Sequence, residues 1–137
     1  MNNNDNPSQK SKRNKKYNTF LPDLYLNQVH ALPNISVNRE GIIVYVNEDT
    51  SRILGYHKKE LLGMEAAQIY INPTDRDVLL KELYGKGAIH NFNVILKKKN
   101  GNAVECTFEK QVFRDTEGNI LGHTGTIKDI KLESDLR

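Results

Sequence analysis

The sequence predicts an α+β domain, in which short helices cover one face of a five-stranded antiparallel sheet. One basis is the order of the segments: two short strands, three helical segments and three long strands. The other is the alternation of apolar and polar residues in the long strands, which is typical of a sheet with one buried face. A chain of 137 residues is long enough for one such domain and too short for two.

The segment from residue 41 to 63 organises the first half of the domain. Residues 42–46 are an apolar, β-favouring run, which we expect to form a strand buried on both faces. Asn47 follows directly, and its side chain can cap the start of a helix. Gly55 and Gly63 can take the left-handed backbone conformation that ends a helix. This pattern predicts a strand followed by two short helices.

Further helices and strands are predicted on either side of this segment. Residues 34–40 should form a strand that pairs with it as a tight hairpin, and residues 66–71 a single helical turn. Asn72 or Thr74 then caps a longer helix, which ends at two glycines. The apolar face of this helix is expected to consist of Val78, Leu79, Leu80, Leu83 and Tyr84.

In the second half of the domain the sequence predicts three long antiparallel strands, at residues 88–99, 103–114 and 120 to about 130. Asn100-Gly101 between the first two is the strongest hairpin signal in the chain. The even-numbered apolar residues of these two strands should share the buried face: Phe92, Val94, Leu96, Val104, Cys106, Phe108 and Val112.

The N-terminal region divides into two parts. Residues 1–16 carry five basic residues and one acidic residue, with no aliphatic core residue beyond Met1, so we expect a disordered basic tail. Residues 17–33 predict a flanking helix, which ends where a leucine precedes a proline. Its apolar stripe should lie on the sheet or form a homodimer with the same helix of a second chain. The stripe consists of Leu21, Leu24, Tyr25 and Val29.

Composition argues against several classes of protein. No segment approaches the roughly 20 apolar residues that span a bilayer, and the N-terminus lacks the apolar stretch of a secretory signal. Cys106 is the one cysteine, which forbids an intramolecular disulfide and fits a reducing compartment. We therefore expect a cytoplasmic protein without a membrane span.

Candidate catalytic groups are explained by their structural positions. Glu105 and Glu109 fall on the polar face of a strand, and Asp75 and Asp77 on the first turn of a helix. No phosphate-binding glycine loop and no nucleophile–base pair can be identified in the sequence. We expect no catalytic residues.

Several short motifs keep a fixed order along residues 30–130. They are Leu32-Pro33, Gly41-Ile-Ile-Val-Tyr-Val-Asn47, Leu54-Gly55-Tyr56, Glu60-Leu61-Leu62-Gly63, Asn72-Pro73 with Asp75-Arg76, Lys99-Asn-Gly101, and Gly118-Asn-Ile120 through Gly125-Thr-Ile-Lys-Asp-Ile130. In this order and spacing they resemble a PAS domain, the sensory module of many signalling proteins.

The resemblance implies a non-catalytic module that senses a small ligand or relays signals by dimerisation. The effector would be a protein such as a histidine kinase of a two-component system. The PAS domain would span residues 34–130, and residues 131–137 would begin a linker or signalling helix. A ligand would lie between the sheet and the helices. Its expected lining consists of Val46, Ile53, Leu79, Phe92, Val94, Cys106, Phe108 and His123.

The resemblance does not identify the ligand or any cofactor. A flavin photoreceptor of the LOV type needs a cysteine just after the Gly63 position, and residues 64–69 contain none. An oxygen-sensing haem PAS domain carries its axial histidine on the long helix, and residues 73–86 contain none. Both observations argue against these two cofactors.

The histidines predict no metal site. His57 and Glu60 have the spacing of one helical turn, but two ligands on an exposed turn do not hold a metal ion. His123 is the histidine expected to line a pocket, because Gly122 and Gly125 beside it leave room for a ligand or a close-packed helix.

An alternative function is a regulator of nucleic-acid-associated complexes, which would contact DNA or RNA through residues 1–16. A solvated tail explains the same composition, because no aromatic residue lies among the charges. The sensory hypothesis is therefore favoured.

Overall fold

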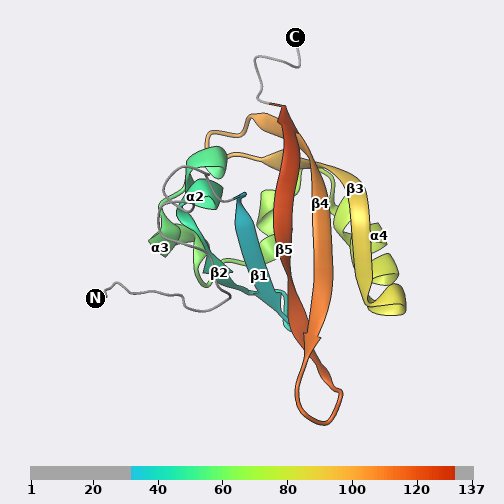
Figure 1. Ribbon diagram of the computed structural model, residues 1–137. Helices are drawn as coiled ribbons and strands as arrows, with labels where there is room; N and C mark the ends of the chain where they lie inside the picture. Colours follow the sequence, from blue (N-terminus) through green and yellow to red (C-terminus); the bar gives the residue numbers. More distant parts are fainter. Residues whose placement is uncertain (1–31, 132–137) are drawn as a thin grey trace, which may run out of the picture. The chain divides into compact units, whose positions relative to one another are not determined.

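The computed structural model describes residues 32–131, which form a five-stranded antiparallel sheet in the order β2-β1-β5-β4-β3 (Figure 1). In chain order the elements are β1 Asn34–Asn38, β2 Ile43–Val46, α2 Glu48–Leu54, α3 Lys58–Leu61, the 3-10 helix η1 Ala66–Ile69, α4 Pro73–Lys86, β3 Ala88–Lys97, β4 Ala103–Arg114 and β5 Ile120–Lys131. The predicted fold class and element order are confirmed.

The sheet joins the two ends of the domain. β1 pairs with β2 on one side and with β5, the last strand, on the other. β5 in turn pairs with β4, and β4 with β3. α4 packs on β3 and β4, while α2 and α3 pack beside β1 and β2 (Figure 1). The core therefore lies between the sheet and this layer of helices.

Some predicted segments fall outside the described residues. The basic tail at residues 1–16 and the flanking helix at residues 17–33, except for its last two residues, are among them, and so are residues 132–137. The predicted dimer contacts also belong to this undescribed part of the chain. Within residues 32–131, no helix is long and apolar enough to cross a membrane.

β2 lies at an edge of the sheet, and the expectation that residues 42–46 are buried on both faces is wrong. The side chains of Val44 and Tyr45 are 48% and 50% exposed, whereas Ile43 and Val46 are buried. A shift of register against β1 places one extra β2 residue between two pairs of the ladder, so both ends of the strand face the core. Composition predicts the strand but not its position in the sheet.

α4 buries a narrower stripe than its sequence predicts. Leu79 and Leu83 are fully buried and Leu80 is half-buried, but Val78 and Tyr84 are 44% and 36% exposed. A helix that rests on one side of a sheet buries only the side chains that point toward that sheet. Val78 and Tyr84 therefore lie at the margins of the contact.

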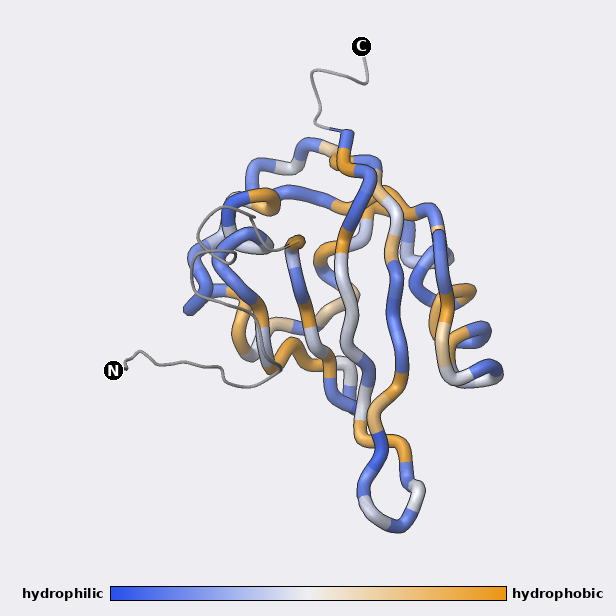
Figure 2. Tube along the Cα trace, viewed as in Figure 1, coloured by the Kyte–Doolittle hydropathy of each residue, from blue (hydrophilic) through white to orange (hydrophobic). Residues whose placement is uncertain are grey.

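The alternation predicted for the long strands supplies the core. Hydrophobic and hydrophilic residues intermix along each strand, as Figure 2 shows. The rings of Tyr70 and Phe108 meet edge to face, with centroids 6.3 Å apart. The buried even-numbered residues of β3 and β4 include Val94, Leu96, Val104, Cys106 and Phe108.

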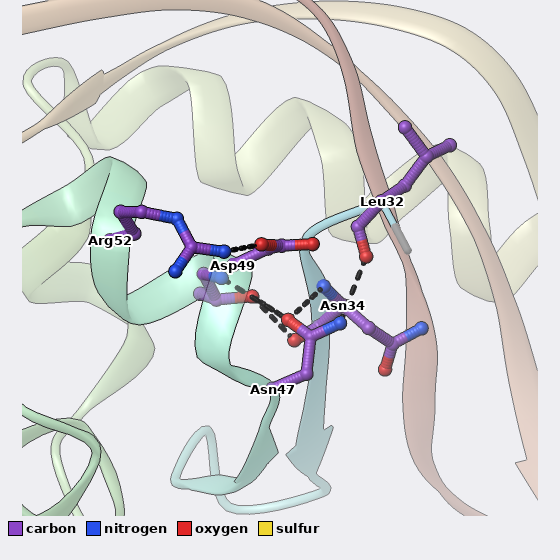
Figure 3. Close-up of polar contacts among 6 residues, drawn as sticks. Leu32, Asn34, Asn47, Asp49 and Arg52 are labelled. Atoms are coloured by element: carbon purple, nitrogen blue, oxygen red, sulfur yellow. Dashed lines mark hydrogen bonds and ion pairs between the residues drawn. The ribbon is translucent and has the colours of Figure 1, made fainter. Parts of the chain in front are cut away.

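Asn47 ties the N-terminal hairpin to α2 (Figure 3). Its Oδ1 accepts hydrogen bonds from the backbone N–H groups of Thr50, at 3.1 Å, and Asn34, at 3.0 Å. Its Nδ2 donates to the carbonyl of Leu32 at 2.9 Å. The fully buried Thr50 adds a hydrogen bond from its hydroxyl to the carbonyl of Asn34 at 2.7 Å. The predicted helix cap is confirmed, and the same side chain also fixes the start of β1.

Replacing Asn47 with Ala should lower the free energy of unfolding by roughly 2–3 kcal/mol, because the cap and two contacts to the start of β1 are lost together. The matched control is Asn72→Ala, since the exposed Asn72 caps α4 through a single hydrogen bond from the N–H of Thr74. That control should lose about 1 kcal/mol. Urea unfolding followed by circular dichroism measures both. Equal losses would contradict the tying role of Asn47.

Candidate ligand site

The residues predicted to line a pocket come together between the sheet and the helices. Those that are buried are Val46, Leu79, Val94, Cys106, Phe108 and His123. Ile53 and Phe92 are partly buried and pack against the same cluster. His123 is the polar member of a set that is otherwise almost entirely apolar. Ligand binding by these residues remains a prediction.

Lys110 is a charged residue in this interior that the sequence analysis missed. It lies on the buried face of β4, and only 3% of its surface is exposed. Its Nζ sits 4.8 Å from the centroid of the Phe108 ring and has no hydrogen-bond partner within the described part of the chain. Burial lowers the pKa of Lys110 to about 7. The ammonium is therefore enclosed without a counter-charge.

A signal for Lys110 was present in the sequence. Position 110 belongs to the even-numbered phase of the strand, between Phe108 and Val112. A lysine in an apolar phase is either at the margin of the sheet or buried. The charge of Lys110 favours an exposed side chain, whereas its place in the apolar phase of the strand favours a buried one.

His123 reaches the same interior from β5. It is 2% exposed, and neither of its ring nitrogens has a hydrogen-bond partner in the region from residue 32 to 131. Its ring lies 6.2 Å from that of Tyr84 on α4, measured between centroids. Burial, followed by the positive charges of Lys110 and Arg76, lowers the pKa of His123 to about 3. The imidazole is therefore neutral at pH 7.

Gly125 leaves space for the side chain of Lys110. The two residues are partners across β4 and β5, and a Cβ atom at Gly125 would lie 2.7 Å from Cγ of Lys110. It would also lie 2.0 Å from the backbone oxygen of Glu109. At Gly122, a Cβ atom would similarly lie 2.2 Å from the backbone oxygen of Val37. These glycines therefore allow neighbouring strands to approach closely. The close contacts are made with strands and not with a packed helix, which was one of the two occupants expected beside them.

The opposite face of the sheet has charges that are paired. Oε1 of Glu109 accepts a hydrogen bond from Nζ of Lys128 at 2.9 Å. Its Oε2 lies 3.1 Å from Nδ1 of His90, within hydrogen-bond distance. Lys128 and then His90 lower the pKa of Glu109. An open hollow of about 260 Å³ lies beside these residues. Glu109 is thus paired with residues on its own face of the sheet.

Cys106 has the properties of a core residue. The thiol is buried, and its burial raises its pKa to about 12, so it stays protonated at pH 7. Across residues 32–131 there is no group of three or more histidine, cysteine, aspartate or glutamate side chains that could hold a metal ion. The unpartnered nitrogens of Lys110 and His123 are therefore the chemical feature that distinguishes this interior.

The pKa of Lys110 makes the stability of the protein depend on pH. In the unfolded chain the amine is protonated at pH values below 10.5, its usual pKa. In the folded chain it is protonated only below about pH 7. The unfolded state consequently binds more protons between these values, and stability falls as the pH is lowered through this window. Below about pH 7 Lys110 is protonated in both the folded and the unfolded state, so its cost to stability no longer changes with pH. His123 adds a further loss between its ordinary value of 6.5 and about 3.

Replacing Lys110 with Met should therefore stabilise the protein by a few kcal/mol at pH 6–7, because an unpaired buried charge is removed. The gain should shrink as the pH approaches 10. Urea unfolding at several pH values measures it. Lys128→Met is the matched control on a neighbouring strand, and it should not gain stability at neutral pH, because only a surface ion pair is broken. A gain for Lys110→Met that does not change with pH would contradict the buried charge.

Comparison with known protein families and solved structures identifies the fold. A family model described as "PAS domain" matches residues 33–131. A PAS domain of a protein from Colwellia psychrerythraea has a TM-score of 0.63 at 16% identity, covering 71% of this chain and 84% of that one. A PAS domain from a two-component sensor histidine kinase has a TM-score of 0.63 at 18% identity, covering 78% and 91%.

A third solved structure, of a light-oxygen-voltage domain with a flavin analogue, has a TM-score of 0.64 at 17% identity and covers 77% of this chain and 82% of that one. At these identities the likeness concerns the fold. Comparison with the sequences of curated proteins gives no match. The family match extends over most of the chain and over every strand and helix described above. The chain therefore belongs to the PAS domain family.

Proposed function

We propose that this chain is a non-catalytic sensory module that binds a small ligand between its sheet and its helices. PAS domains are generally non-catalytic sensory modules. The observation that carries the proposal is the pair of buried groups, Lys110 and His123, whose side-chain nitrogens have no partner among residues 32–131. Enclosed donors without partners destabilise a protein, and a bound molecule that hydrogen-bonds to them removes this cost.

The location of these groups supports sensing. Lys110 and His123 lie on the two central long strands, and Tyr84 faces His123 from α4. A ligand held there would contact sheet and helix at the same time. It would favour whichever arrangement of the two fits it better, which is how binding changes the surface that a partner meets. The effector we propose is a signalling protein such as a histidine kinase, as in the two-component sensor to which the fold is similar.

A ligand retained from cells tests this proposal. Native mass spectrometry of the full chain, purified without denaturation, should show an added mass of a few hundred daltons or less. The double variant Lys110→Met with His123→Phe should lose that mass, whereas Lys128→Met should keep it, because Lys128 lies on the opposite face. Protein that never carries a small molecule, and that no metabolite extract stabilises against heat, would contradict ligand sensing.

Dimerisation is the second part of the proposal. It rests on the apolar stripe of the predicted helix at residues 17–33, which includes Leu24 and Val29. Contact between such a stripe and the same stripe of a second copy is a common way to remove the apolar face of an amphipathic helix from water.

Replacing Leu24 and Val29 with Glu should convert a dimer into a monomer that stays folded. Light scattering measures the mass and circular dichroism the fold. Asn2→Glu with Asn3→Glu, in the polar tail, is the control and should leave the dimer intact. A monomer at high concentration before any substitution would contradict dimerisation.

A further inference from the structure

The interior of the domain presents hydrogen-bond donors and positive charge. The ammonium of Lys110 has three N–H donors, and the neutral imidazole of His123 has one donor and one acceptor. Neither side chain has a polar partner between residues 32 and 131. Arg76, on α4, adds a guanidinium whose charge acts on His123. Lys110 and His123, called the cationic cluster below, therefore offer unused donors to an acceptor.

Among residues 32–131, no carboxylate is paired with Lys110 or His123. Glu109, the residue next to Lys110, points to the opposite face and is paired there with Lys128. On α4, the charge of Asp75 acts on Tyr70, but it is not among the charges that shift the pKa of Lys110 or His123. The counter-charge for the cationic cluster must therefore come from outside residues 32–131.

We infer that the ligand is a small organic carboxylate with an apolar body, bound with its carboxylate between Lys110 Nζ and the ring of His123. This inference rests on the proposed ligand-sensing function and specifies its chemistry. A charge-assisted hydrogen bond from an ammonium to a carboxylate is among the strongest that side chains form. The carboxylate would satisfy a donor of Lys110 and a donor of His123 at once.

The surroundings favour a carboxylate with an apolar body over inorganic phosphate. Lys110 rests over the ring of Phe108 and lies opposite Ile89 of β3, so the walls beside the ammonium are apolar. Phosphate carries more charge and more acceptor oxygens than one ammonium and one neutral imidazole can satisfy in such a setting. A carboxylate matches the single positive charge of Lys110, and its apolar body matches the walls.

Binding of a carboxylate is coupled to protonation of Lys110. The groups that face it are His123 from β5 and the apolar Ile89 from β3, with Tyr84 and Arg76 of α4 next to His123. His123 is neutral above pH 6. Between pH 6 and 9, therefore, Lys110 changes charge while His123 does not, since the pKa of Lys110 is about 7. Affinity for an anion should fall as the pH rises through this range.

The experiment uses sodium benzoate, sodium hexanoate and neutral benzamide as probes of the full chain, freed of any retained molecule. Thermal shift and titration calorimetry at pH 6.5 and pH 9 measure binding. At least one of the two carboxylates should raise the melting temperature and benzamide should not, because only an anion compensates the ammonium. The affinity should fall roughly tenfold or more at pH 9, where Lys110 is deprotonated.

Variants separate the cationic cluster from general effects of charge. Lys110→Met should abolish the carboxylate response while remaining folded, as urea unfolding checks. Lys128→Met should respond like the unmodified protein, because its ammonium lies on the other face and is already paired. A response that survives in Lys110→Met would overturn the inference.

The remaining outcomes distinguish this inference from the function on which it rests. A retained molecule that is neutral, or benzamide that binds as well as benzoate, would overturn the carboxylate while leaving ligand sensing in place. Stronger stabilisation by inorganic phosphate than by either carboxylate would do the same. Failure of both carboxylates overturns the inference, and the additional absence of any retained molecule overturns the sensing function too. A carboxylic acid identified in the native protein would support both.

Discussion

A buried ammonium group must either lose its proton or find a counter-charge, and this constraint governs the interior of the domain. Lys110 lies on the buried face of β4, with the Phe108 ring beneath its Nζ and no hydrogen-bond partner within residues 32–131. His123 faces the same space with both ring nitrogens unpaired. Such groups cost a protein stability, and cores seldom contain them without a compensating contact. The sheet and helices enclose them all the same, and it is this cost that a carboxylate ligand would relieve.

The rest of the architecture holds the strands and helices around these two groups. β1 lies between β2 and β5, so the two ends of the domain are joined in one sheet. Asn47 holds the start of β1 and the start of α2 together through hydrogen bonds to both. Gly125 lets β5 approach β4 at the position where the Lys110 side chain crosses it. A change in how α4 rests on the long strands would therefore alter the surroundings of the cationic cluster, and binding there would alter how α4 rests.

Local signals in the sequence were enough to predict most of the fold. Asn47 and Gly55 act as the cap and the stop of a helix, which depend on neighbouring residues alone. The place of β2 at the edge depends on which strands pair, and composition does not report this. For the candidate site, His123 was predicted and Lys110 was not. The phase of the strand indicated that Lys110 is buried, but its lack of a partner depends on the distant residues that α4 and β5 bring beside it.

The titration of the Lys110 side chain tests the central claim most directly. Nuclear magnetic resonance of the full chain with isotope-labelled lysine follows each ammonium group, and the signal absent from Lys110→Met identifies this one. In the ligand-free protein the account predicts that it titrates near pH 7, well below the ordinary value of 10.5, and that a bound carboxylate moves it back upward. Titration near 10.5 in the ligand-free protein, or a value that bound carboxylate leaves unchanged, would contradict the account.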